Sequence, residues 1–175
     1  MENLMLRTGP GTLFDSQAAL QKDTQLLILG QSPGDQWLYV ETADGVMGWV
    51  FSLLLNPGSA VAAAPIIQPE NTQLITGRVF DGNGNPISGI QFSFIQGTGS
   101  NPPRTDAVTD STGTFYAFMP LSAHGTWTVS YTAVACTSNT MDANCNCLNG
   151  ACGKPDPELT TVILPFSGTL TFVWK

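Results

Sequence analysis

The 175-residue chain is poor in cationic residues and in charged residues of any kind. Lysine and arginine together number 6 against 13 aspartates and glutamates, so the net charge is −7, and only 11% of the residues are charged. The six cations stand apart from one another, whereas nucleic acids and anionic membrane surfaces bind clustered cations. We therefore expect neither a nucleic-acid partner nor a membrane-surface partner.

Long apolar runs are also lacking. No stretch approaches the roughly 18 consecutive apolar residues of a membrane-spanning helix. The N-terminal sequence MENLMLRTG lacks the cationic region and apolar run of a secretory signal. We expect no membrane insertion of this chain, and any export signal or anchor would lie upstream on a longer protein.

The residues that are present indicate an all-β protein. The chain is 42% hydrophobic and contains 18 glycines and 12 prolines, which excludes wholesale disorder and a helical bundle. Short β-branched and aromatic runs alternate with turn pairs such as Pro33-Gly34, Asp44-Gly45 and Asp81-Gly82. The one helical candidate, Phe14 to Lys22, is too short to be stable alone, and we predict a loop there.

A segment rich in proline and alanine divides the chain. Residues 57–73 show neither strand nor helix periodicity and are predicted to be a linker between residues 1–56 and residues 74–175. In the first part, Trp37 and Tyr39 alternate with Leu38 and Val40. So short a β segment satisfies its sheet edges most economically by closing into a small barrel.

The motifs of the first part resemble the bacterial SH3-like domain. They are LMLRTGPG, QKDTQLLILG, QWLYV and GVMGWVF, in the order of that family over roughly residues 3 to 55. Asp23 replaces the glycine usual in the family's turn, and aspartate tolerates a left-handed backbone. Ser16 replaces an apolar residue in the long first loop, so the shape of that loop stays open.

The second part is predicted to be a seven-stranded β-sandwich of the immunoglobulin-like or transthyretin-like kind. Its strands are expected at LITGRVF, IQFSFI, TDAVT, GTFYAF, TWTVSYTAV, LTTVIL and TLTFVW. The stretches ITGRVFDGNGNPISGIQFSF and AVTDSTGTFYAFMPLSAHGTWTVSY resemble the carboxypeptidase regulatory-like domain. This resemblance implies an accessory sandwich of an extracellular protein with no catalysis of its own.

All four cysteines, Cys136, Cys145, Cys147 and Cys152, fall within one predicted loop. This clustering predicts two disulfides, and hence a chain that works outside the cytoplasm. Two pairings stay open, Cys136–Cys145 with Cys147–Cys152 or Cys136–Cys147 with Cys145–Cys152, because the ring between Cys145 and Cys147 is too tight. A zinc site is the alternative, although the spacing lacks the C-x2-C pairs that structural zinc favours.

The sequence offers little material for catalysis or metal binding. His124 is the single histidine, and no nucleophile motif accompanies it. The oxygen-rich run Asp81 to Asn85 lacks the downstream acidic ligand of a calcium loop and is explained by a hairpin. We predict no enzymatic activity, no metal and no cofactor.

The candidate binding site is a set of aromatic residues in the first part. Because Leu38 and Val40 face the barrel core, Trp37 and Tyr39 are predicted to be at least partly exposed, whereas Trp49 is predicted to fill the core. Phe14, Asp15 and Asp35 are predicted to flank them. The SH3-like resemblance implies cell-wall peptide or glycan as the ligand. The alternative is a structural spacer or adhesion module that contacts other envelope proteins through the cysteine loop.

Overall fold

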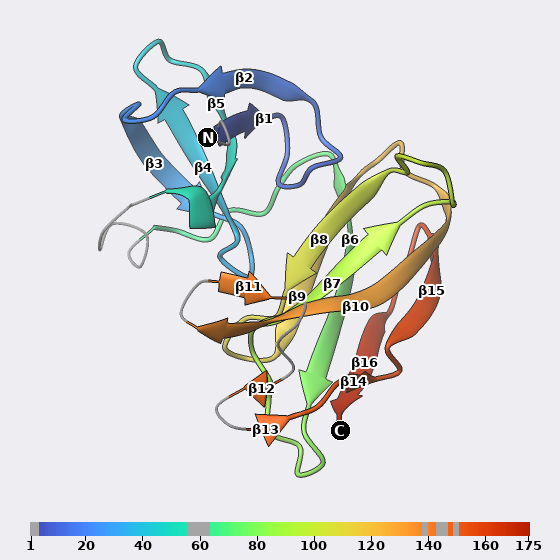
Figure 1. Ribbon diagram of the computed structural model, residues 1–175. Coiled ribbons are helices and arrows are strands. Elements are labelled where there is room, and N and C mark those ends of the chain that lie inside the picture. The colour runs from blue at the N-terminus through green and yellow to red at the C-terminus, as the bar shows by residue number, and fades with distance from the viewer. Residues whose placement is uncertain (1–3, 56–63, 138–139, 143–146, 149–150) are drawn as a thin grey trace.

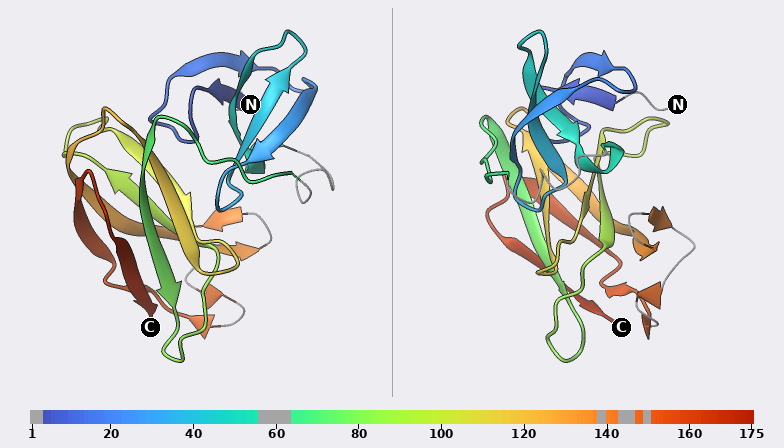
Figure 2. Two further views of the ribbon diagram at one scale, coloured as in Figure 1. Left: turned by 180° about the vertical axis from the view of Figure 1, so that it is seen from behind. Right: turned by 90° about the vertical axis from the view of Figure 1, so that its left-hand side faces the viewer.

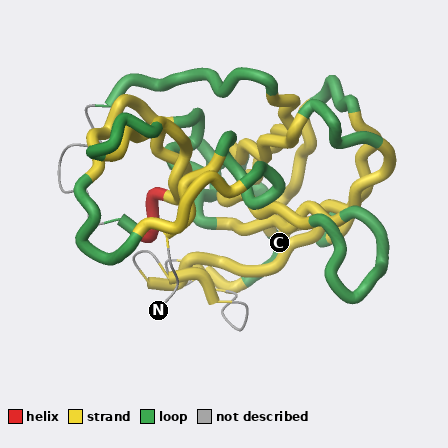
Figure 3. Tube along the Cα trace, turned by 90° about the horizontal axis from the view of Figure 1, so that it is seen from above, coloured by secondary structure: helices red, strands yellow, loops and turns green. Residues whose placement is uncertain are grey.

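The computed structural model describes residues 4–55, 64–137, 140–142, 147–148 and 151–175, without the side chains of residues 134–152. It confirms the all-β prediction and consists of an N-terminal sheet followed by a β-sandwich (Figure 1). The short 3-10 helix η1 (Ser52–Leu54) follows the last strand of the N-terminal sheet (Figure 3). No helix in these described ranges is long and apolar enough to cross a membrane.

The N-terminal sheet has five antiparallel strands in the order β2-β1-β5-β4-β3. Their bounds are β1 Leu4–Arg7, β2 Ser16–Leu20, β3 Leu26–Gln31, β4 Trp37–Thr42 and β5 Met47–Phe51. As the alternation in WLYV predicts, Leu38 and Val40 are fully buried, and they join Leu6, Leu20 and Val50 in one apolar cluster. Asp23 has φ 67°, the left-handed turn that the sequence predicts there.

The loop prediction for Phe14 to Lys22 is wrong, because this segment contains strand β2. Its residues pair with β1 from Leu4↔Leu20 to Arg7↔Ser16, with a bulge before Arg7. Ala18 and Leu20 lie on the core side of the strand, and alternate residues share one face. Alanine is depleted in strands, so this alternation gives only a weak sequence signal.

The sandwich contains the seven predicted strands in two sheets. They are β6 Thr72–Phe80, β7 Ile90–Ile95, β8 Arg104–Val108, β9 Thr114–Pro120, β10 Gly125–Thr137, β15 Leu159–Leu164 and β16 Thr169–Trp174. Four short strands accompany them: β11 Thr140–Asp142, β12 Cys147–Leu148, β13 Ala151–Cys152 and β14 Pro155–Asp156. One sheet has the order β14-β16-β6-β9, and the other has β11-β10-β7-β8 with β15 also beside β10 (Figure 2).

An aromatic cluster fills the space between the two sheets. Phe92 lies 4.5 Å from Phe172 and 5.1 Å from Phe115, measured between ring centroids. Trp127 and Val129 of β10 are buried in the same core, as their alternation with threonine predicts. The hydroxyl-bearing residues Thr126, Thr128 and Ser130 alternate with them and face away from this core, so the first part of β10 buries one face.

The core approaches the backbone of β6 most closely at Gly77. A methyl group at this position would overlap the Phe115 ring and lie 3.0 Å from Cβ of Leu170. We expect Gly77→Ala to lower the free energy of unfolding by about 1–3 kcal/mol, because the packed rings must shift. Gly82→Ala is the control, since nothing lies within 4 Å of a methyl group there. Urea denaturation of both variants tests the prediction, and equal stabilities would contradict it.

Candidate functional site

Two loops of the N-terminal sheet contact the sandwich at β8 and β9. The first loop is residues 8–15, between β1 and β2, and the second loop is residues 32–36, between β3 and β4. In the first loop, the Thr12 hydroxyl donates a hydrogen bond of 2.6 Å to the carbonyl oxygen of Arg104 in β8. Leu13 packs against the sandwich core. In the second loop, Gly34 lies so close to Tyr116 of β9 that a Cβ atom would be 2.7 Å from the ring. These contacts fix the N-terminal sheet beside β8 and β9.

The end of the predicted linker also packs against the N-terminal sheet. The N–H group of Gln31 donates to the carbonyl of Pro65 at 2.9 Å, and the N–H group of Ile67 donates back to Gln31 at 2.8 Å. The amide of the Gln31 side chain donates to Ala64. Residues 64–67 therefore lie beside the end of β3 and pair with it through the parallel bridge Gln31↔Ile66.

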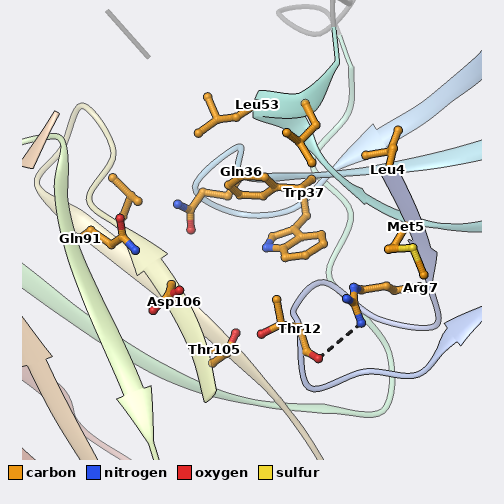
Figure 4. Close-up of a pocket in the computed structure, with 13 residues that line it drawn as sticks. Leu4, Met5, Arg7, Thr12, Gln36, Trp37, Leu53, Gln91, Thr105 and Asp106 are labelled. Carbon is orange, nitrogen blue, oxygen red and sulfur yellow. Dashed lines mark hydrogen bonds between the residues drawn. The ribbon is translucent and has the colours of Figure 1, made fainter. Parts of the chain in front are cut away.

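A groove of about 630 Å³ lies between the N-terminal sheet and the outer face of β7 and β8 (Figure 4). Its apolar wall comes from β1, β4, β5 and η1: Leu4, Met5, Trp37, Phe51, Leu53 and Leu54. Its other wall carries Gln91, Thr105, Asp106 and Val108 of the sandwich. A concave apolar surface with a few polar groups, at the junction of two units, is the usual form of a ligand site.

Trp37 forms the aromatic centre of this groove. The β4–β5 register places Trp37 opposite Phe51 and Tyr39 opposite Trp49. The ring centroids are 5.4 Å apart in the first pair and 5.1 Å apart in the second, both tilted, a favourable geometry for aromatic pairs. These four rings therefore line the face of the sheet opposite to the Leu38 and Val40 cluster.

Arg7 supplies positive charge at the groove. Its guanidinium donates to the carbonyl of Phe14 at 2.8 Å and, more weakly, to that of Thr12, and burial lowers its pKa. No carboxylate of the described chain forms an ion pair with Arg7. Across the groove, Asp106 pairs with Arg104 at 3.0 Å and accepts a hydrogen bond from Ser93. Within the described residues the negative charge of Asp106 is therefore paired, whereas the positive charge of Arg7 has no paired carboxylate and can attract an anionic group of a ligand.

Of the five predicted site residues, only Trp37 lines the groove. The prediction that Trp37 is partly exposed is wrong. Only 7% of the residue is exposed, and its ring packs against that of Phe51. Tyr39 is partly exposed as predicted, next to Trp49. Trp49 is buried, but outside the core cluster that it was predicted to fill.

The other three predicted residues belong to the two covering loops. Phe14 is buried with its ring against Gly9. Asp15 is exposed, and its carbonyl accepts the N–H of Thr8. Asp35 lies in the second loop with φ 54°. Partial desolvation raises the pKa of Asp35, and Asp110 of the sandwich lies near enough for its negative charge to raise it further. The loop that carries Phe14 and Asp15 thus contacts the sandwich through Thr12 and Leu13.

Several groove residues were not predicted from the sequence. Arg7 lies in the quoted RTGPG motif, and Leu53 and Leu54 form an exposed apolar run directly after a strand, so a signal existed for these three. Gln91 and Asp106 gave no signal, because the sequence does not show how the two units meet.

The remaining candidates have local structural roles. His124 is exposed, with Nδ1 2.8 Å from the carbonyl oxygen of Ser122. The Asp81 carboxylate accepts the side-chain amide of Asn85 and the N–H groups of Asn83 and Asn85, which lowers its pKa. Asp81 thereby organises the predicted hairpin. Across the described parts of the chain, His, Cys, Asp and Glu form no group of three placed to hold a metal ion.

The predicted disulfides lie outside what the structure describes. Cys145 is not among the described residues, and the side chains of Cys136, Cys147 and Cys152 are not described. The backbone register of β12 and β13 is described, and it places Cys147 directly opposite Cys152.

Comparisons with known proteins gave structural neighbours only. No family model and no curated protein sequence matches the chain. A DUF3823 family protein from Parabacteroides merdae is 14% identical with a TM-score of 0.37, covering 59% of this chain and 46% of its own. BcpA, the major pilin subunit of Bacillus cereus, is 14% identical with a TM-score of 0.39, covering 79% and 37%. A streptococcal ancillary pilin is 13% identical with a TM-score of 0.39, covering 94% and 45%. The chain spans less than half the length of each neighbour.

The contact between the units contains a destabilising carboxylate. Partial desolvation at the contact raises the pKa of Asp35, although much of the residue stays exposed, and the negative charge of Asp110 raises it further. The folded protein therefore binds a proton at Asp35 at higher pH than the unfolded chain does. We expect Asp35→Asn to increase the free energy of unfolding at pH 7, and asparagine also tolerates the positive φ.

This gain should shrink as the pH falls from the raised pKa of the folded state to the ordinary pKa of about 4 in the unfolded state, because wild-type Asp35 becomes neutral. Urea denaturation across this pH range, with the exposed Asp44→Asn as control, provides the measurement. A gain that does not change with pH would contradict the assignment.

Proposed function

We propose that this chain is a non-catalytic structural and adhesion module that works outside the cytoplasm and holds its partner in the groove beside Trp37. The observation that carries the proposal is the groove itself, with an apolar aromatic wall, a few polar groups and one uncompensated cation. Such a surface binds and orients a ligand, and it lacks the arrangement of nucleophile and base that catalysis requires.

The groove best fits an extended protein segment. Leu53 and Leu54 are exposed beside Trp37, which provides apolar surface for a side chain of the partner. Arg7 favours a carboxylate on that partner, because its charge is partly buried and unpaired within the described residues. A partner that combines apolar and acidic residues matches the wall that the N-terminal sheet provides.

The two units are proposed to be a bacterial SH3-like barrel, residues 1–56, and a carboxypeptidase regulatory-like sandwich, residues 74–175, with residues 57–73 between them. The sequence motifs of the two parts support this assignment, and so does the structural role of a polar residue in one of them. The Asp110 carboxylate in AVTDSTGTF accepts the N–H groups of Thr112 and Thr114 and shapes the turn before β9.

A cell-wall peptide or glycan is the second candidate ligand. Phe51, which is partly exposed beside the buried Trp37, offers an aromatic face, and Gln36 and Gln91 offer amide groups within the same groove. Aromatic stacking combined with hydrogen bonds suits sugars and short peptides. The two candidates share one site and differ in the partner that fills it.

The variant Leu53→Glu tests the groove. The new carboxylate places charge on the apolar wall, so we expect at least a tenfold loss of binding, about 1.4 kcal/mol. Peptides selected from a random displayed library on the wild-type chain are the first probe, and purified insoluble peptidoglycan is the second. Fluorescence titration measures the first and co-sedimentation the second.

Leu27→Glu is the matched control, because Leu27 is an exposed leucine on β3 outside the groove. Peptides rich in apolar and acidic residues that bind wild type and Leu27→Glu but not Leu53→Glu support the adhesion proposal. Co-sedimentation with the same dependence on Leu53 makes the cell wall the ligand instead. Equal binding by both variants, or no binding to either probe, overturns the groove as the contact site.

We further propose the disulfide pairs Cys147–Cys152 and Cys136–Cys145. The direct pairing of Cys147 and Cys152 across β12 and β13 supports this choice, since opposite residues of antiparallel strands have Cα separations that a disulfide can bridge. Mass spectrometry of peptides from the unreduced chain should show this pairing and no free thiol. Four free thiols that bind zinc would contradict it and remove the main argument for an extracytoplasmic location.

A further inference from the structure

Strand β15 forms an unpaired edge of the sandwich (Figures 1 and 2). It pairs with β10 alone, from Ser130↔Leu159 to Gly125↔Leu164. The N–H group of Tyr131 donates to the carbonyl of Glu158, and hydrogen-bonded positions alternate along an antiparallel pair. The backbone groups of Leu159, Thr161 and Ile163 therefore point away from β10. Nothing in the described chain hydrogen-bonds to them.

The edge on the other side of the same sheet is protected. The Thr12 hydroxyl bonds to the outward carbonyl of Arg104 in β8, and Arg104 and Asp106 place charges along that strand. Strand β15 has neither protection: its sequence LTTVIL carries no charge, and Leu159 and Ile163 are 58% and 68% exposed. Natural proteins normally guard such an edge against pairing with another strand.

The exposed edge is complementary to itself. If two copies of β15 meet antiparallel about a two-fold axis at Thr161, Thr161 faces its own copy and Leu159 faces Ile163 at both ends. All three of these residues direct their backbone N–H and C=O groups outward, so each facing pair can exchange both hydrogen bonds. The facing side chains are then apolar pairs flanking a threonine pair, combinations that stabilise sheets.

The charges next to the edge do not oppose this contact, although the chain as a whole carries −7. Glu158 is paired with Lys154 at 3.2 Å, and Asp156 is paired with Lys175. We propose that β15 is a self-association site, through which two copies of the chain form a symmetric dimer with one continuous sheet. A single strand pair is a small interface, so we expect a reversible dimer.

Sedimentation equilibrium of the full chain over a range of concentrations tests the proposal. Wild type should show a monomer–dimer equilibrium. Thr161→Lys places two ammonium groups opposite each other at the axis and should weaken the dimer. Thr171→Lys is the matched control, because it adds the same charge at an exposed threonine of β16, on the opposite face of the sandwich, and should leave the dimer unchanged. Far-ultraviolet circular dichroism checks the fold of both variants.

A charge exchange tests the register. Leu159→Lys/Ile163→Lys and Leu159→Glu/Ile163→Glu each bring like charges together and should weaken self-association more than tenfold. Their mixture brings opposite charges together and should restore the dimer. A wild-type monomer at every concentration, a dimer insensitive to Thr161→Lys, or a mixture that stays monomeric overturns the proposal. None of these outcomes bears on the groove, because β15 contributes no residue to it.

Discussion

The backbone groups at the edge of an open β-sheet need hydrogen-bond partners, and this requirement governs how the molecule is assembled. At β8, the Thr12 hydroxyl reaches the carbonyl of Arg104. At β3, residues 64–67 supply the partners of Gln31. The loop with Thr12 therefore covers part of the β8 edge, and together with the loop that contains Gly34 it holds the N-terminal sheet against the sandwich.

The groove is a consequence of that contact. The loops hold the curved N-terminal sheet against one side of the sandwich, and the aromatic face of β4 and β5 is left opposite the outer face of β7 and β8. Residues of both units line the groove. The site therefore depends on the two units keeping their relative position, which links the stability of the contact, including the unfavourable pair Asp35 and Asp110, to binding.

Local alternation predicted most of the fold. The strands IQFSFI, LTTVIL and TLTFVW have the predicted bounds. The buried residues of LTTVIL and TLTFVW alternate with exposed ones, whereas IQFSFI buries Ser93 as well as its phenylalanines. Strand β2 was missed since SQAAL has a weak strand propensity. The site was predicted only at Trp37. Alternation shows which residues of a strand face away from the core of their own sheet. It cannot show that a loop containing Leu13 packs against the sandwich, or that Trp37 is buried in the assembled chain.

The first and last main strands of the sandwich, β6 and β16, are parallel neighbours, in register from Thr169↔Thr76 to Val173↔Phe80. A tension applied between the start of β6 and the end of β16 pulls these two strands in opposite directions along their common axis. Every hydrogen bond between them is then loaded in shear at the same moment, instead of opening one after another. The arrangement makes the sandwich a mechanically resistant link between whatever is attached at its two ends.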